Sequence, residues 1–221
     1  MIKENKYRVD SYDFKKSNSK IETIFPTPLR CLIVGPSDSG KTTLLCNIVQ
    51  KRWITYDNLY IFTKSINQRV YDYLQELFSD IDTVETFISD KDIIPVDECN
   101  SNSLVVFDDC MLENQRVIKE YFVRSRHKNI SCIYLAQNYV LTDLQTIRVN
   151  LNFLIVFEQL EHYVKKLWSD FFSSFRTLNE FKSLCISCWK VRYGFLALDI
   201  KNKCLYKKLD NCYIERCLNV D

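Results

Sequence analysis

Short apolar runs alternate with helical patterns along the first two thirds of the chain. The runs are continuous, which is typical of strands that are buried on both faces of a sheet. The segments between several of them place apolar residues three and four positions apart, as amphipathic helices do. Strands are therefore predicted over residues 29–34, 59–62, 83–88, 104–107, 130–136 and 151–157, and helices over residues 42–52, 68–78 and 112–126.

The alternation of strands and helices predicts a parallel sheet, because parallel neighbours need crossover connections that place helices on both faces. The last third of the chain differs. Helical patterns at residues 159–172 and 178–184 precede two strand-like runs, 195–200 and 204–209, which flank a short polar turn. We expect these two strands to pair antiparallel. The predicted fold class is α/β, with a central, mainly parallel sheet flanked by helices and an antiparallel strand pair near the C-terminus.

Length and composition narrow the picture. The 221 residues, 47% hydrophobic and 26% charged, suit a single folded domain, predicted over residues 25–221 after a polar N-terminal extension, residues 1–24. The apolar runs are too short to span a membrane, and the N-terminus lacks the apolar stretch of a secretory signal, so we expect an intracellular protein. The ten scattered cysteines are expected to be reduced thiols. The net charge of +2 is too small to attract nucleic acid by itself, so any contact with nucleic acid must come from local basic patches.

The loop after the first predicted strand has the pattern of a phosphate-binding loop. Residues 35–42 fit G-x-x-x-x-G-K-[ST], and they lie between a predicted strand and a predicted helix, as this motif requires. The chain has only three glycines, and Gly35 and Gly40 hold both glycine positions of the motif. Lys41 is expected to reach the β- and γ-phosphates of a nucleoside triphosphate, and Thr42 to ligate Mg²⁺. The predicted nucleotide-binding residues are Gly35, Pro36, Ser37, Asp38, Ser39, Gly40, Lys41, Thr42 and Thr43.

Two further predicted strands end in polar residues suited to phosphate chemistry. Asp108, after residues 104–107, is expected to hold Mg²⁺, and Asp109 to orient or deprotonate the attacking water. Gln137 follows residues 130–136, where its amide can bind both the γ-phosphate and that water. Alone, an Asp-Asp pair is more often a turn or helix cap, and a strand-end amide is as often only a satisfied polar group. Downstream of a phosphate-binding loop, both favour a nucleotide site.

A basic segment and a group of cysteines each allow two roles. The segment contains Arg116, Lys119, Arg124, Arg126, His127 and Lys128. A charge run is usually a solvated helix face, but an arginine here could also enter the nucleotide site of a neighbouring subunit. The cysteines Cys185 and Cys188, with Cys204, Cys212 and Cys217 downstream, could bind zinc, yet a second close pair is missing, which favours ordinary thiols.

Together, in this order, these elements resemble the FtsK/HerA superfamily of ring-forming, DNA-pumping ATPases, and most closely the genome-packaging ATPases of poxviruses, virophages and Polinton elements. The resemblance covers residues 29–157 and rests on FDDC at 107–110, RSRHKNISCIYLAQNY at 124–139 and IRVNLNFLIVF at 147–157. It implies a P-loop NTPase of the additional-strand type, with the Gln137 strand between the phosphate-loop strand and the Asp108 strand. It also implies ATP and Mg²⁺ as cofactors.

The resemblance further implies an ATP-hydrolysing translocase that packages double-stranded viral DNA into a capsid. Such an enzyme works as a pentameric or hexameric ring, with a capsid or portal component as a further partner, at the site of virus assembly in the host cytoplasm and in the virion. Its catalytic residues would be Lys41, Asp109, Gln137 and, from the neighbouring subunit, Arg126, with Arg124 and Arg148 as alternatives. The chain departs from the pattern in two ways: it lacks the extra domains of cellular relatives, and its second acid is Asp109 where many motor ATPases have glutamate.

Two other classes of protein open with the same loop. A small-molecule or nucleotide kinase is the main alternative, but it needs a lid, and no arginine-rich lid segment stands out in the sequence. A GTPase-like switch is disfavoured because the chain has no Asn-Lys-x-Asp element for guanine recognition.

Overall fold

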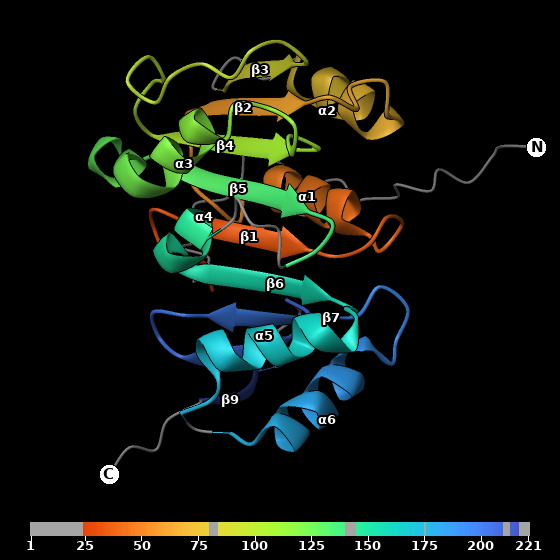
Figure 1. Cartoon of the computed structure of the whole chain (residues 1–221). Helices are drawn as coiled ribbons and strands as arrows, with labels where there is room; N and C mark the ends of the chain where they lie inside the picture. Colours follow the sequence, from red (N-terminus) through yellow and green to blue (C-terminus); the bar gives the residue numbers. More distant parts are fainter. Residues whose placement is uncertain (1–23, 80–83, 140–144, 175, 210–212, 217–221) are drawn as a thin grey trace, which may run out of the picture.

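In the part of the chain that the structure describes, nine strands form a single sheet with helices on both of its faces (Figure 1). The computed structural model describes residues 24–79, 84–139, 145–174, 176–209 and 213–216. The predicted N-terminal extension lies outside these residues except for Ile24, so the boundary between extension and domain stays a prediction.

The strand order is β3-β2-β4-β5-β1-β6-β7-β8-β9. The first six strands along the chain are all parallel, and the last three are antiparallel, which confirms the predicted fold class and the predicted pairing near the C-terminus. As predicted, β5 lies between β1 and β4. The strands are β1 (Arg30–Val34), β2 (Asn58–Thr63), β3 (Glu85–Ser89), β4 (Ser103–Asp108), β5 (Ser131–Ala136), β6 (Phe153–Phe157), β7 (Phe195–Asp199), β8 (Cys204–Lys207) and β9 (Tyr213–Arg216).

Two apolar layers hold the helices on the sheet. Successive residues of β1 alternate between them: Cys31 and Ile33 pack in one layer, and Leu32 and Val34 in the other. The first layer is covered by α1 (Lys41–Gln50) and α2 (Arg69–Ser79). The second is covered by α3 (Gln115–Arg124), α4 (Gln145–Asn150), α5 (Glu161–Phe171) and α6 (Leu178–Trp189). A 3₁₀ turn, η1 (Ser125–Lys128), follows α3 directly.

The observed elements differ from the predicted ones mainly at their ends. Helix α3 begins at Gln115 rather than at residue 112, because the Asn114 side chain caps it by accepting the N–H of Arg116 at 3.2 Å. Helix α6 runs five residues past its predicted end. Neither α4 nor β9 was predicted. The six residues of α4 are too few to display a helical periodicity, and β9, with the sequence YIER, has only two apolar residues.

The eight cysteines in the described residues are all free thiols and all buried. Burial raises the pKa of Cys46 to about 11 and that of Cys132 to about 12. Cys185 and Cys188 belong to the apolar layer beneath α6. No cluster of three or more histidine, cysteine or acidic side chains suited to a metal ion occurs in the part of the chain that the structure describes, and Cys212 and Cys217 lie outside it. Every helix in that part is too short or too polar to cross a membrane.

Candidate functional site

The carboxyl ends of β1, β4 and β5 meet at one edge of the sheet, and the predicted site residues follow directly from them. Parallel strands end at the same edge, so the loop after β1, the acids at the end of β4 and the amide after β5 become neighbours. A cleft of about 1140 Å³ opens there. Its lining includes Lys41, Thr42, Asp108, Asp109 and Gln137.

The loop after β1 has the geometry that the motif requires. Its backbone is tied to β5, because the Gly35 N–H donates to the carbonyl of Ala136 at 3.1 Å. It ends at Gly40, whose φ of 101° is a left-handed conformation that glycine adopts without strain. Helix α1 then begins, so its unpaired N–H groups and its positive dipole end lie at the cleft. An anion in the cleft would meet both.

Lys41 places its ammonium group against the same loop. Its Nζ donates to the carbonyl oxygens of Gly35 at 2.6 Å and Pro36 at 2.8 Å. Burial lowers the pKa of Lys41, and the nearby carboxylates of Asp108 and Asp38 oppose this shift. The cation is thus held against the loop that would bind a phosphate.

Asp108 is a buried acid with a specific partner. Its carboxylate Oδ2 accepts a hydrogen bond from the hydroxyl of Tyr71, which lies on α2. Burial raises the pKa of Asp108, whereas the Tyr71 hydroxyl and the charge of Lys41 lower it. Burial also raises the pKa of Tyr71, so its hydroxyl keeps its proton and acts as the donor.

The residues of the cleft fit a bound Mg²⁺. Hydroxyl and carboxylate oxygens are ligands that this ion prefers, and Thr42 and Asp108 bring one of each to the same cleft. The charge of Asp108 is costly because the side chain is desolvated, and a nearby cation would offset that cost.

Asp109 differs from its neighbour in conformation and exposure. Its φ is 56°, which turns the chain sharply after β4, and its side chain is exposed while Asp108 is buried. The Ser65 hydroxyl, just after β2, donates to Asp109 Oδ2 at 2.6 Å. A non-glycine residue in a left-handed conformation persists only where its surroundings impose it.

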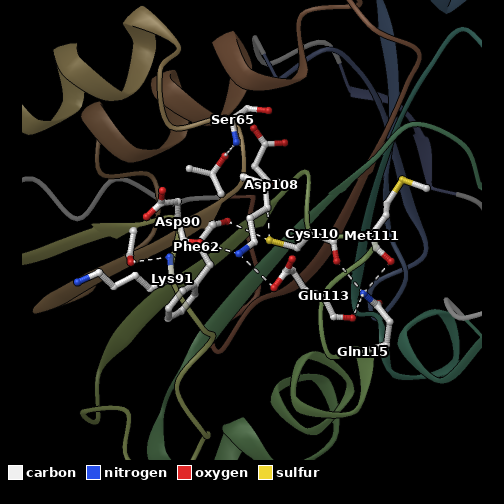
Figure 2. Close-up of polar contacts among 12 residues, drawn as sticks. Phe62, Ser65, Asp90, Lys91, Asp108, Cys110, Met111, Glu113 and Gln115 are labelled. Atoms are coloured by element: carbon white, nitrogen blue, oxygen red, sulfur yellow. Dashed lines mark hydrogen bonds and ion pairs between the residues drawn. The ribbon is translucent and has the colours of Figure 1, made fainter.

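The segment after Asp109 provides such surroundings (Figure 2). Gln115 Nε2 donates to the carbonyl oxygens of Cys110 at 2.7 Å, Met111 at 3.2 Å and Glu113 at 3.1 Å. The Cys110 thiol donates to the carbonyl of Phe62 on β2 at 3.3 Å. The loop that carries Asp109 is therefore fixed both to itself and to the neighbouring strand.

Gln137 is the first residue after β5, and its exposed side chain lines the cleft. The chain is anchored two residues later. The Tyr139 hydroxyl donates to Asp170 of α5 at 2.8 Å, and the Tyr139 carbonyl accepts from Arg148 of α4 at 3.1 Å. Gln137 is thus a polar side chain on a fixed backbone.

The structure distinguishes the three candidate arginines, none of which is among the described residues that line the cleft. The Arg148 side chain is 13% exposed and pairs with Tyr139 and Asp170. Nη2 of Arg124 donates to both carboxylate oxygens of Asp97 at 2.9 Å. Arg126 is exposed in η1, which precedes β5 and so lies at the sheet edge opposite the cleft.

Four residues that contact the acids or line the cleft are among those that were not predicted. Tyr71 and Ser65 contact the two acids from 37 and 44 positions away in sequence, and neither belongs to a motif. Arg192 and Tyr193 line the cleft from the turn between α6 and β7. One signal could have found this turn, because Gly194, the third glycine of the chain, lies in it.

Comparison with known proteins gives both a family and a fold. The sequence model of the family described as Poxvirus A32 protein matches residues 16–171. No curated protein sequence matches the chain. The genome packaging NTPase B204 from Sulfolobus turreted icosahedral virus 2, in complex with sulfate, is 14% identical, with a TM-score of 0.57 over 82% of this chain and 96% of that one. The DNA-packaging ATPase B204 from Sulfolobus turreted icosahedral virus is 18% identical, with a TM-score of 0.53 over 80% and 95%.

Proposed function

Because the chain belongs to the Poxvirus A32 protein family, we propose that it hydrolyses ATP and couples hydrolysis to the packaging of double-stranded viral DNA. The observation that carries this proposal is the cleft in which Lys41, Asp108, Asp109 and Gln137 meet. Two proteins of the same fold, named as a genome packaging NTPase and a DNA-packaging ATPase, support it.

Each residue of the cleft has a role in this proposal. The loop and Lys41 bind the triphosphate, and Thr42 and Asp108 hold Mg²⁺, which when bound neutralises charge on the phosphates. Asp109, held by Ser65, orients the attacking water and accepts its proton. Gln137 contacts the γ-phosphate from the end of β5.

We infer that the enzyme acts as a ring of five or six copies. Arg126 lies at the edge of the sheet opposite its own cleft, so it would act in the cleft of the next subunit. The ring would grip DNA through phosphate contacts without reading its sequence. Residues 25–221 would form the working domain, at the site of virus assembly in the host cytoplasm and in the virion, with a capsid or portal component as partner.

An ATPase assay with and without double-stranded DNA tests the proposal. We expect DNA to stimulate ATP hydrolysis, two duplexes of unrelated sequence to stimulate it equally, and added salt to reduce the stimulation. Equal rates with and without DNA, together with transfer of phosphate to a small acceptor, would instead identify a kinase.

Tyr71→Phe is expected to raise the Mg²⁺ concentration needed for ATP turnover. The hydroxyl of Tyr71 orients the carboxylate of Asp108, and losing such a partner typically weakens metal affinity by roughly 10- to 100-fold. It should also lower the free energy of unfolding by about 1.5–3 kcal/mol, because a buried carboxylate loses a hydrogen bond. Turnover titrated with Mg²⁺ and denaturant unfolding measure the two effects.

Tyr121→Phe is the matched control. Tyr121 is also a fully buried tyrosine, but its hydroxyl donates to the backbone carbonyl of Ile94 at 2.9 Å. This variant should lose stability, about 0.5–1.5 kcal/mol, with no change in the Mg²⁺ requirement. If both variants shift the Mg²⁺ titration equally, Tyr71 has no specific role at Asp108.

A further inference from the structure

The turn between α6 and β7 lies on the phosphate-binding loop. β7 runs antiparallel to β6, and its first residue, Phe195, pairs with Phe157, the last residue of β6. The turn before β7 therefore reaches the same sheet edge as the loop after β1. Tyr193 packs closely against Gly40 of that loop: a Cβ at Gly40 would lie only 3.3 Å from Cδ1 of the Tyr193 ring.

The backbone of this turn is strained at Tyr193. Its φ is 58°, a left-handed conformation that is unusual for a bulky side chain. Gly194 makes the turn tight: its N–H donates to the Val191 carbonyl at 2.8 Å, and a Cβ there would lie 2.2 Å from the carbonyl oxygen of Cys188. Such a conformation persists only where the surrounding structure imposes it, so the position of the Tyr193 side chain is fixed by the turn.

The turn carries a cation and an exposed aromatic ring as a pair. The guanidinium carbon of Arg192 lies 4.8 Å from the centroid of the Tyr193 ring, within the range of a cation–π contact. Tyr193 is nevertheless 48% exposed, and both residues line the cleft. A tyrosine that is held by the backbone, stacked by an arginine and half open to the cleft is a ready surface for a flat ligand.

The two ends of the cleft are chemically different. Asp108, Asp109 and Gln137 come from β4 and β5, on one side of β1, and they mark the end where the terminal phosphate would lie. The other end extends along α1 and beyond it to Lys51 and Trp53. On the opposite side of β1 it reaches Phe195 of β7 and Lys208, just after β8. A nucleoside triphosphate whose γ-phosphate lies near β4 must place its nucleoside at this second end.

We propose that Tyr193 and Arg192 form a nucleoside-binding subsite, in which the base stacks on the Tyr193 ring and Arg192 holds that ring in place. The inference rests on the proposed function, because it needs a triphosphate in the loop. It assigns to the C-terminal third of the chain a part in binding substrate. Since stacking uses the flat face that all bases share, the subsite accepts adenine and guanine alike.

The test compares ligands with and without a nucleoside. Calorimetric titration of the full chain at fixed Mg²⁺ measures the binding of ADP, GDP and inorganic tripolyphosphate. Tyr193→Asn removes the ring but keeps a residue that tolerates the left-handed conformation. We expect this substitution to weaken the binding of ADP and of GDP roughly 10-fold or more and to leave the binding of tripolyphosphate unchanged. Tyr193→Phe, which keeps the ring, should bind all three as the unchanged protein does.

Two further variants keep the outcome interpretable. Arg192→Ala leaves Tyr193 in place. It should weaken the binding of ADP about threefold, again without affecting the binding of tripolyphosphate. Phe87→Thr replaces an exposed aromatic residue on β3, at the far edge of the sheet, and should change nothing. If Tyr193→Asn is unfolded by circular dichroism, Arg192→Ala decides the question.

The failures are distinguishable. If tripolyphosphate does not bind the unchanged protein, the proposed function fails at the phosphate loop. If tripolyphosphate binds, but neither Tyr193→Asn nor Arg192→Ala weakens the binding of ADP, only the proposed nucleoside subsite is refuted. If the variants weaken ADP and tripolyphosphate equally, the turn supports the phosphate loop and does not bind the nucleoside.

Discussion

Lys41→Ala is expected to reduce ATP turnover by roughly 1,000-fold, because it removes the cation that the loop holds beside the phosphate-binding site. The ammonium group is fixed by two backbone carbonyl oxygens, so it is already in place before phosphate binds. Such a preorganised charge stabilises the transition state without the cost of reorganisation. Steady-state phosphate release measures the loss.

A second lysine provides the control for this variant. Lys91 is exposed just after β3, outside the residues that line the cleft, so Lys91→Ala should leave turnover unchanged. The free energy of unfolding of both variants should lie within about 1 kcal/mol of that of the unchanged protein, since neither lysine is in the core. Turnover of Lys41→Ala above one tenth of the normal rate would contradict the role of this lysine.

Arg126→Ala is expected to lower turnover by roughly 10³- to 10⁵-fold in the assembled oligomer, the range reported for an arginine that enters a neighbouring site. β5 is six residues long, so about 20 Å separate its two ends, and Arg126 lies beyond the end that is remote from the cleft. It is too far away to act on its own nucleotide. The residual activity of dilute, dissociated subunits should therefore be the same with and without the substitution.

Mixing two inactive variants makes this prediction sharp. A Lys41→Ala subunit has no working cleft but still carries Arg126, whereas an Arg126→Ala subunit has an intact cleft and lacks the arginine. Mixed oligomers should recover activity, because the first subunit supplies its arginine to the second. No recovery, although mass spectrometry shows that the subunits have mixed, would refute action in trans. Arg124→Ala, which loses an ion pair with Asp97, is the matched control and should stay active.

Much of the fold and the centre of the site could be predicted, because both depend on local patterns. The continuous apolar runs predicted the strands, and the position of Gln137 and Asp108 at strand ends predicted that they would lie together at one sheet edge. The order of the motifs predicted a resemblance to poxvirus packaging ATPases, which the family match confirms. The chemical roles of these residues stay predictions.

The contacts that support the site could not be predicted, because they join residues that are distant in sequence through tertiary packing. Tyr71 lies within the helix predicted over residues 68–78 and belongs to no motif. Only the packing of α2 on the sheet brings its hydroxyl to Asp108. Tyr193 reaches the cleft because β7 reverses direction relative to β6. A strand pair near the C-terminus was predicted, but the register that returns its preceding turn to the phosphate loop has no local signal.

The burial of the cysteines determines when their thiols can be oxidised. Only the thiolate form reacts readily with oxidants or alkylating reagents, and burial suppresses that form in the folded chain. Unfolding exposes all eight thiols of the described residues together and returns each to its ordinary reactivity. For these eight thiols, oxidation is therefore a consequence of unfolding rather than its cause, and the rate at which they are modified is a measure of how often the fold opens.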